Sequence, residues 1–283
     1  MSLRRFLRSL RFELGKALRA RLTWVTLLLP ALLTVVSVGI SEGVRRTEQL
    51  AGGAHIEGIQ SAFAPFSRGA SNGFVLGGIL LLFYSSMIVA NEGSLRTFKI
   101  TLIRPHARLE LLGAKLSLLL LLSLALVAAV ISSGLLAAAA LADYVDIAEE
   151  GFVLYKADFM THESVRAVLL LLPALVALSA FGLMVSTLSD HTGIAASGCI
   201  GAYIFLEALK GSLANARHYL FNAHMPSLLD DSYFKALRGF ADGLSDVAWQ
   251  PEWFMLGIVT PLVSALVFAS VAAWVFGRRD FLV

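Results

Sequence analysis

The chain has 283 residues, of which 57% are hydrophobic and only 15% are charged, and its mean hydropathy is +0.76. Soluble domains contain roughly 25% charged residues, so this composition excludes a soluble protein and indicates an integral membrane protein. The formal net charge of +3 is too small to indicate a particular class of partner. We expect no nucleic-acid partner. The single cysteine, Cys199, excludes an internal disulfide and a cysteine-built metal site.

Residues 1–21 have the pattern of an amphipathic helix. Its apolar positions recur at spacings of three and four: Leu3, Leu7, Leu10, Leu14 and Leu18. Arginines and Lys16 occupy the opposite face. Such a helix lies in the membrane interface with its cations near anionic headgroups. We therefore expect a cytoplasmic interfacial helix, and the alternative is a plain basic flank of the first span.

Six apolar stretches follow that approach or exceed the roughly 20 helical residues that a bilayer core requires. They lie near residues 22–40, 73–90, 111–141, 165–188, 193–209 and 254–276. The third is long enough to tilt or to project from the membrane, and the fifth is short. The sequence therefore predicts an all-α membrane protein with six transmembrane helices, in which residues 22–283 form a single transmembrane domain.

Lysine and arginine gather in the N-terminal segment, in the loop after the second span and at the C-terminus. The positive-inside rule places such segments in the cytoplasm. The connections 41–72, 143–163 and 211–252 then fall outside, and the second of them is acidic. In the connection 211–252, residues of three kinds (aromatic, leucine and charged) recur at helical spacing. We therefore expect short amphipathic helices there that can dip back into the membrane. Both termini are predicted to be cytoplasmic, and an even number of spans is consistent with termini on the same side.

The most ordered polar segment lies between the second and third spans, from Asn91 to Lys115, and reads NEGSLRTFKITLIRPHARLELLGAK. Pro105 interrupts any helix that runs through it, so Ser94–Ile103 can form a short helix and Ala107 can begin the third span. A short helix with one cationic and one apolar face suits docking to a cytoplasmic partner. The alternative is an ordinary positive-inside loop, which needs cations but not this order of residues.

This segment resembles the first cytoplasmic loop of ABC-2-type transporter permeases, in which an acidic-Gly-Thr-Leu-Arg start precedes a Pro-x-x-Arg turn. The matching residues are Glu92, Gly93, Ser94, Leu95, Arg96, Arg104, Pro105 and Arg108. Ser94 stands where those permeases usually have threonine, and the ending Phe276–Phe281 is also similar. The resemblance implies an ABC-2 (type V exporter-like) architecture with a cytoplasmic coupling helix between spans 2 and 3. It also implies that the matching residues contact an ATPase.

The same resemblance implies the partners. They are two copies of a cytoplasmic ABC ATPase subunit, a second copy of this chain and the lipid bilayer, in a bacterial inner (plasma) membrane. A Walker A motif is absent, because Gly113-Ala114-Lys115-Leu116 lacks the phosphate-binding glycines and hydroxyl. We therefore expect no catalytic residue and no cofactor in this chain, with ATP and Mg bound by the partner ATPase.

Three further groups of residues carry predictions. Ser197, Gly198 and Gly201 are small residues that allow close helix packing, either within the chain or across a dimer. Glu207 and Lys210 lie three positions apart and can pair on one helix face, either as part of a polar substrate path or at the interfacial end of the fifth span. His218 and His224 would need further ligands to hold a metal, so we expect no metal site.

The function predicted from these features is that of a permease subunit, a homodimer that exports an unidentified substrate when separate ATPase subunits drive it. One alternative is a mechanotransmitting ABC membrane subunit that acts on an extracytoplasmic partner protein. A second alternative is an ATP-independent channel or membrane assembly factor. The sequence specifies neither the substrate nor whether the dimer contains one or two kinds of permease.

Overall fold

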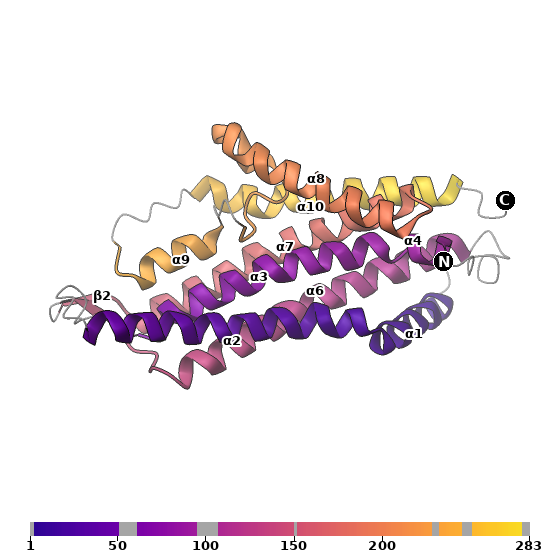
Figure 1. The fold of residues 1–283 in the computed structure, drawn as a ribbon. Coiled ribbons are helices and arrows are strands. Elements are labelled where there is room, and N and C mark those ends of the chain that lie inside the picture. Colours follow the sequence, from indigo (N-terminus) through magenta and orange to yellow (C-terminus); the bar gives the residue numbers. More distant parts are fainter. Residues whose placement is uncertain are drawn as a thin grey trace.

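The computed structural model describes residues 3–50, 61–94, 107–149, 152–227, 232–244 and 251–278. The described helices are α1 (Leu3–Arg19), α2 (Arg21–Leu50), α3 (Phe63–Met87), α4 (Ala90–Ser94), α6 (Ala107–Ala139), α7 (Ala157–Leu188), α8 (Thr192–Ser212), the 3-10 helix η1 (Ala214–Tyr219), α9 (Tyr233–Ala241) and α10 (Pro251–Arg278). Strands β1 (Ile147–Glu149) and β2 (Phe152–Tyr155) form an antiparallel pair. The long helices lie side by side as one elongated bundle (Figure 1).

Within the described ranges, 6 helical segments are long and apolar enough to cross a membrane. They are Arg21–Thr47, Phe63–Ser94, Leu109–Ala139, Ala157–Leu188, Thr192–Ser212 and Glu252–Arg278. The prediction of an all-α membrane protein with six transmembrane helices is confirmed. The short β1–β2 hairpin was not predicted, because its segment was expected only as an acidic connection.

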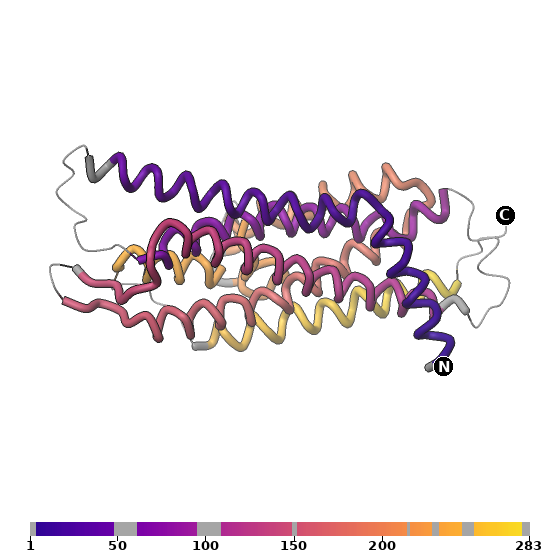
Figure 2. Tube along the Cα trace, turned by 90° about the horizontal axis from the view of Figure 1, so that it is seen from below, coloured from indigo at the N-terminus to yellow at the C-terminus, as the bar shows by residue number. Residues whose placement is uncertain are grey.

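The two ends of the bundle differ in content. Helices α1 and α4, the start of α6 and the last turn of α10 lie at one end, here named the terminal end (Figure 1). The β1–β2 hairpin and α9 lie toward the opposite end, here named the hairpin end (Figure 1). Figure 2 shows the same arrangement from below, with α1 bending away from the axis of α2.

Several helices are longer than the apolar stretches that predict them. Helix α2 continues to Leu50, α3 begins at Phe63 and α7 begins at Ala157. Hydropathy marks only the part of a helix that lies in hydrocarbon, whereas backbone hydrogen bonding continues wherever the side chains tolerate water. Near the end of α2, Glu42 pairs with Arg45 at 2.7 Å and with Arg46 at 3.0 Å. The polar connections 41–72 and 143–163 are therefore partly helical.

Helices α3 and α7 form the centre of the core, and small residues bring their backbones close to neighbours. A Cβ atom on Gly73 of α3 would overlap Thr34 Oγ1 of α2, and a Cβ on Gly182 of α7 would overlap Ser85 Oγ of α3. Membrane helices use such small residues because close packing, rather than water exclusion, holds them together. Among the described helices, α2–α3 and α3–α7 thus form tight contacts.

The connection after α8 turns back into the bundle. After η1, residues 221–226 are all buried. The ring of Phe221 lies 5.6 Å from that of Phe181 in α7 and 5.3 Å from that of Phe268 in α10. A Cβ on Gly78 of α3 would stand 3.0 Å from Met225 Cε. The connection then continues to α9, a short helix that packs its apolar face on α3 and α7.

Candidate functional site

The second span ends in a break that a side chain from another helix stabilises. Helix α3 ends at Met87, and α4 restarts at Ala90. Ser186 Oγ of α7 accepts hydrogen bonds from the backbone N–H groups of Val89 and Ala90, both at 3.0 Å. These donors would otherwise lack partners at the start of a helix. Helix α4, the last described element before the polar loop, is thus attached to α7.

Four charged side chains meet where α1, α4 and α6 come together, and we name them the charge cluster: Glu13, Lys16, Glu92 and Lys115. Lys115 Nζ lies 2.7 Å from Glu92 Oε1 and 3.3 Å from Glu13 Oε2. Lys16 Nζ lies 2.7 Å from Glu13 Oε1 and 2.5 Å from Glu92 Oε1. Each carboxylate therefore contacts both ammonium groups, and the charges of the cluster balance.

Lys115 is the most deeply placed member of the charge cluster, with a side chain only 1% exposed. It donates three hydrogen bonds, to Glu13, to Glu92 and to the backbone carbonyl of Ile88 at 3.2 Å. An ammonium group has three donors, so all of them have acceptors here. A buried charge is tolerated only with such compensation, and the loss of Lys115 would leave Glu13 and Glu92 with Lys16 as the one remaining cation of the cluster.

Lys16 forms the more exposed edge of the charge cluster, with 41% of its side chain accessible. Partial burial lowers the pKa of Lys16, but hydrogen bonds and attraction from Glu13 and Glu92 outweigh this effect and raise the pKa above its ordinary value. Lys16 therefore carries its charge throughout the neutral range, and it holds α1 against α4.

A cavity of about 220 Å³ borders the charge cluster. Tyr84, Met87 and Asn91 from the end of the second span contribute to its walls. Thr23 at the start of α2 donates a weak hydrogen bond to Tyr84 Oη at 3.4 Å. The cluster therefore borders open space on one side and is not wholly enclosed by packed side chains.

Helix α4 also contacts the fifth span. Ser94 Oγ lies 3.1 Å from Thr192 Oγ1, the first residue of α8. Together with Lys16, Lys115 and Ser186, this contact joins α4 to α1, α6, α7 and α8. A short helix of five residues thus touches most of the elements at the terminal end.

The predicted loop residues are placed only in part. Glu92, Gly93 and Ser94 lie on α4, and α6 begins at Ala107, as Pro105 indicates. Leu95, Arg96, Arg104 and Pro105 lie outside the described residues, and so does the side chain of Arg108. The coupling helix expected over Ser94–Ile103 therefore stays a prediction.

Sequence reasoning missed Glu13, Lys16 and Lys115 as members of the site. Glu13 is the acidic residue within the otherwise basic helix Leu3–Arg19, and it stands three positions after Leu10 and one before Leu14. An acid beside the apolar stripe of a basic helix was the available signal. It indicates a side chain that a cation on another element must meet.

The predicted packing residues of α8 face away from the chain. Ser197, Gly198 and Gly201 are exposed. No atom of another described element lies within 4 Å of a Cβ built on Gly198 or Gly201. These residues make no tight contact inside the described part of the chain, so their role in a dimer stays a prediction.

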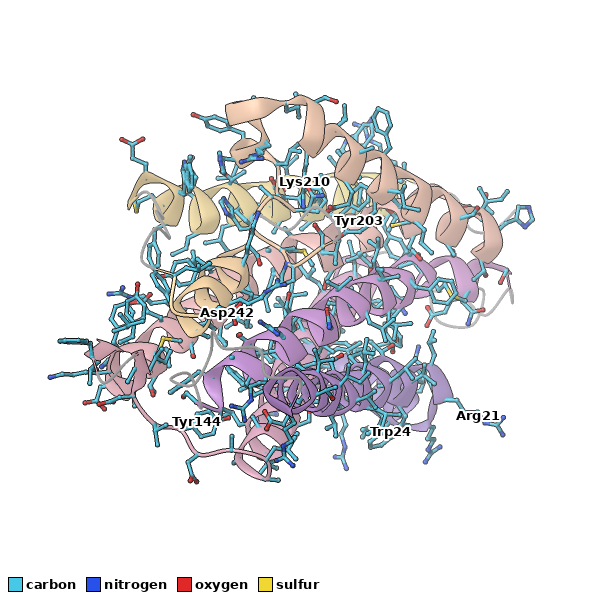
Figure 3. All side chains as sticks on the ribbon, turned by 60° about the vertical axis from the view of Figure 1, so that its left-hand side comes forward. Arg21, Trp24, Tyr144, Tyr203, Lys210 and Asp242 are labelled. Atoms are coloured by element: carbon cyan, nitrogen blue, oxygen red, sulfur yellow. The ribbon has the colours of Figure 1, made fainter. Side chains whose placement is uncertain are left out.

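Glu207 and Lys210 form an ion pair that fixes the buried connection after α8. Their charged atoms lie 2.8 Å apart. Asn222 Nδ2 donates to Glu207 Oε1 at 2.7 Å, and Lys210 Nζ lies 3.4 Å from Ser227 Oγ. Figure 3 labels Lys210 and Tyr203 on the side of α8 that faces the bundle, and both are buried. A substrate path through this pair stays a prediction.

The two neighbouring histidines belong to an aromatic stack. The rings of His218 and His224 lie 5.6 Å apart, and His218 stacks on Trp253 at 4.5 Å. Among the residues described, no group of three or more His, Cys, Asp or Glu side chains is placed to hold a metal ion. The contacts of both rings are those of packed side chains.

The fold and the site together define the class of protein: a membrane subunit with six spanning helices, an amphipathic first helix and a short helix that ends the second span. The family profile described as ABC-2 family transporter protein matches residues 9–189, which include the whole charge cluster. The chain belongs to this family. It is the permease component of an ABC transporter, which generally works with a cytoplasmic ATPase. No curated protein sequence gives a significant match.

Proposed function

We propose that the chain is the permease of an ATP-driven exporter, a homodimer moved by two separate cytoplasmic ATPase subunits that dock on the segment from Glu92 to Arg108. The charge cluster is the observation that carries this proposal. It joins α4, where that segment leaves the bundle, to α1 through Lys16 and to α6 through Lys115. A force applied to the segment is therefore passed to two other elements.

The distribution of cations supports a cytoplasmic position for the terminal end. The basic helix α1, with Lys16 and Arg19 in its last turn, lies there. The positive-inside rule favours the cytoplasm for such a segment. With this orientation the hairpin end faces outward, and α4 lies on the side where ATP is available.

Transmission follows from the cost of breaking the contacts of α4. Separating Glu92 from Lys115 removes one of the two ion pairs that each group forms in the cluster, and the disruption of a buried pair costs up to about 3–5 kcal/mol. Helix α4 therefore carries α1 and α6 with it when the docked ATPase moves. The helices shift as packed units between two arrangements. The role proposed for this chain therefore consists of movement and involves no covalent chemistry.

The exposed faces of α2 and α8 support a second copy of the chain as partner. Trp24, Leu28 and Leu32 of α2 are 47%, 60% and 59% exposed, and Figure 3 shows Trp24 pointing away from the bundle. The face of α8 with Ser197, Gly198 and Gly201 is open as well. A dimer that buries small residues of α8 would form the close contacts that membrane helices favour.

Co-purification of the chain with a cytoplasmic ATPase tests the docking. We expect Arg96→Glu to abolish the complex and the permease-dependent stimulation of ATP hydrolysis. The exposed Lys156→Glu, at the hairpin end, is the control with the same charge change, and it should leave both unchanged. Retention of the complex and of full stimulation in Arg96→Glu would contradict the proposed interface.

A further inference from the structure

A second cavity, of about 510 Å³, lies at the hairpin end, between α6, α7 and the start of α3. Its apolar walls include Phe63 and Phe66 of α3, Ile131 and Leu135 of α6, and Val168 and Leu169 of α7. Its polar residues, Asp158, Thr161 and Ser164, lie within the first turns of α7. Tyr144, which Figure 3 labels near the end of α6, completes the rim. The cavity is thus apolar along its length and polar at one end.

This cavity opens on the surface of two membrane-spanning helices. Leu135 of α6 is 39% exposed, and Val165 and Leu169 of α7 are 53% and 52% exposed. All three side chains belong to segments that are long and apolar enough to cross the bilayer. The medium at the mouth of the cavity is therefore lipid, and the cavity is a groove that bilayer molecules enter from the side.

The groove reaches from the membrane interface into one leaflet. From Asp158 to Leu169, α7 rises about 16 Å at 1.5 Å per residue. The apolar stretch of this helix begins near Val165, so the polar rim lies at the level of the headgroups and Leu169 lies in hydrocarbon. A lipid whose headgroup lies at the rim can direct an acyl chain past Val165 and Leu169.

The groove has the volume of a small-molecule site. Ligand pockets in proteins are clefts of roughly 300–1,000 Å³ with mostly apolar walls, and the groove, at about 510 Å³, lies in this range. A single hydrocarbon chain is an occupant of this kind.

The polar rim offers hydrogen-bond acceptors. The hydroxyl groups of Thr161 and Ser164 donate to the backbone carbonyls of Ala157 and Met160, at 2.9 and 2.8 Å. Their remaining capacity is therefore to accept, and the Asp158 carboxylate only accepts.

Tyr144 adds no free donor to the rim, because its hydroxyl donates to the Leu135 carbonyl at 3.2 Å. Burial raises the pKa of Tyr144 to about 12, which keeps this proton in place. A headgroup that brings an ammonium group, with three donors, complements these acceptors. An anionic headgroup without an amine can donate only from hydroxyl groups, and it brings a net negative charge close to Asp158.

We propose that the groove binds one acyl chain of a phospholipid with an ammonium headgroup, of the phosphatidylethanolamine class, from the leaflet at the hairpin end. The ammonium group lies against Asp158, and the chain runs between α6 and α7 toward Leu169. This site needs only insertion of the chain in a bilayer, so it stands independently of the proposed exporter function.

Photolabelling of the full chain in nanodiscs tests the site. The probe is phosphatidylethanolamine with a diazirine in its acyl chain, and labelled peptides are identified by mass spectrometry. Peptides that contain Ile131–Leu135 and Val165–Leu169 should be labelled well above peptides from α10 that contain Leu266, which is 70% exposed but does not line the groove. Equal labelling of all lipid-facing surfaces would overturn the proposal.

Two substitutions sharpen the result. Val168→Trp fills the groove, so it should lower labelling of Ile131–Leu135 about tenfold, as a loss of about 1.4 kcal/mol would. Leu136 is the next residue on α6, and its exposed side chain does not line the groove. Leu136→Trp should therefore leave that labelling unchanged. Groove labelling that persists in a folded Val168→Trp protein would contradict an acyl-chain site. The pattern on the unaltered protein decides the question if Val168→Trp does not fold.

A comparison of two lipids with different headgroups tests the headgroup assignment. A diazirine-bearing phosphatidylglycerol should label the groove less than the ethanolamine lipid does. Asp158→Asn should reduce this preference about threefold, because an exposed ion pair contributes less than about 1 kcal/mol, while the chain label stays in place. Equal labelling by the two lipids in the unaltered protein would overturn the ammonium headgroup.

Discussion

The two ends of the bundle differ in what their charged side chains connect. At the terminal end, the charge cluster joins three elements, α1, α4 and α6. At the hairpin end, the buried acids Glu42 and Glu163 pair with arginines of their own helices at 2.7 and 2.6 Å, and the pair Arg68–Asp242 is partly exposed at 2.8 Å. The rings of Tyr155, Phe159 and Phe240 also pack there at centroid distances of 5.4–5.6 Å. We therefore assign transmission to the terminal end and a supporting role to the hairpin end.

The largest effect should come from Lys115→Met, which keeps the length of the side chain and removes its charge. Glu13 and Glu92 then share Lys16 as the one remaining cation of the charge cluster. We expect a loss of about 3–5 kcal/mol of stability, measured as a lower Tm by tryptophan fluorescence in detergent. Lys156→Met, at an exposed site of the hairpin end, should change stability by less than about 0.5 kcal/mol. Equal Tm values for the two variants would contradict the comparison.

A double substitution tests whether the charge cluster acts as one unit. Glu92→Gln neutralises one of the two acids that lose their buried cation in Lys115→Met. The double variant should therefore lose less stability than the sum of the single losses, with a coupling of about 1–3 kcal/mol. Denaturation of the three variants under identical conditions measures this coupling. Simple additivity would show that Glu92 and Lys115 do not depend on each other.

A packing substitution in the core gives a smaller effect. Gly73→Ala forces a methyl group into Thr34 of α2, and overpacking of this kind costs about 1–3 kcal/mol. In Gly15→Ala the new methyl group meets no described neighbour within 4 Å, so stability should hold or rise slightly. The difference in Tm between the two variants is the measurement. A Gly73→Ala protein as stable as Gly15→Ala would argue against the close α2–α3 contact.

The loss of an exposed ion pair at the hairpin end should reduce stability only slightly, and this reduction should depend on salt concentration. Asp242→Asn removes the partner of Arg68, and exposed pairs contribute about 1 kcal/mol or less. Salt screens exposed charges over a Debye length of about 3 Å at 1 M. The small loss in Asp242→Asn should therefore disappear in 1 M NaCl, whereas the loss in Lys115→Met should persist. A high-salt rescue of Lys115→Met would contradict its burial.

The contribution of Lys16, at the exposed edge of the charge cluster, to stability should decrease at alkaline pH. Because the folded state raises the pKa of Lys16, its contribution is present below the unfolded pKa of about 10.4. It is lost as pH rises through the higher folded pKa. The Tm difference between the unaltered protein and Lys16→Met should thus narrow above about pH 10.4. A difference that stays constant to higher pH would show that the Lys16 charge is not what stabilises α1.

The sequence predicted features that depend on neighbouring residues. Hydropathy located the six spanning helices, and Pro105 indicated that α6 begins at Ala107. The contact between Glu13 and Lys115 joins residues 102 positions apart, and no local pattern encodes such a separation. The β1–β2 hairpin has strands of 3 and 4 residues, too short for an alternating pattern to be legible. The groove could not be predicted either, because it depends on how the side chains of α3, α6 and α7 pack against one another.

The most direct test of the account separates docking from transmission. A complex of the chain with its ATPase is assembled with either Lys115→Met or Lys156→Met, at a temperature below both Tm values, and ATP hydrolysis is measured per bound ATPase. We predict that Lys115→Met retains the ATPase but loses most of the permease-dependent stimulation, about tenfold if a single interaction of about 1.4 kcal/mol is removed from the transition. Lys156→Met retains both. Full stimulation in a folded Lys115→Met complex would contradict transmission through the charge cluster.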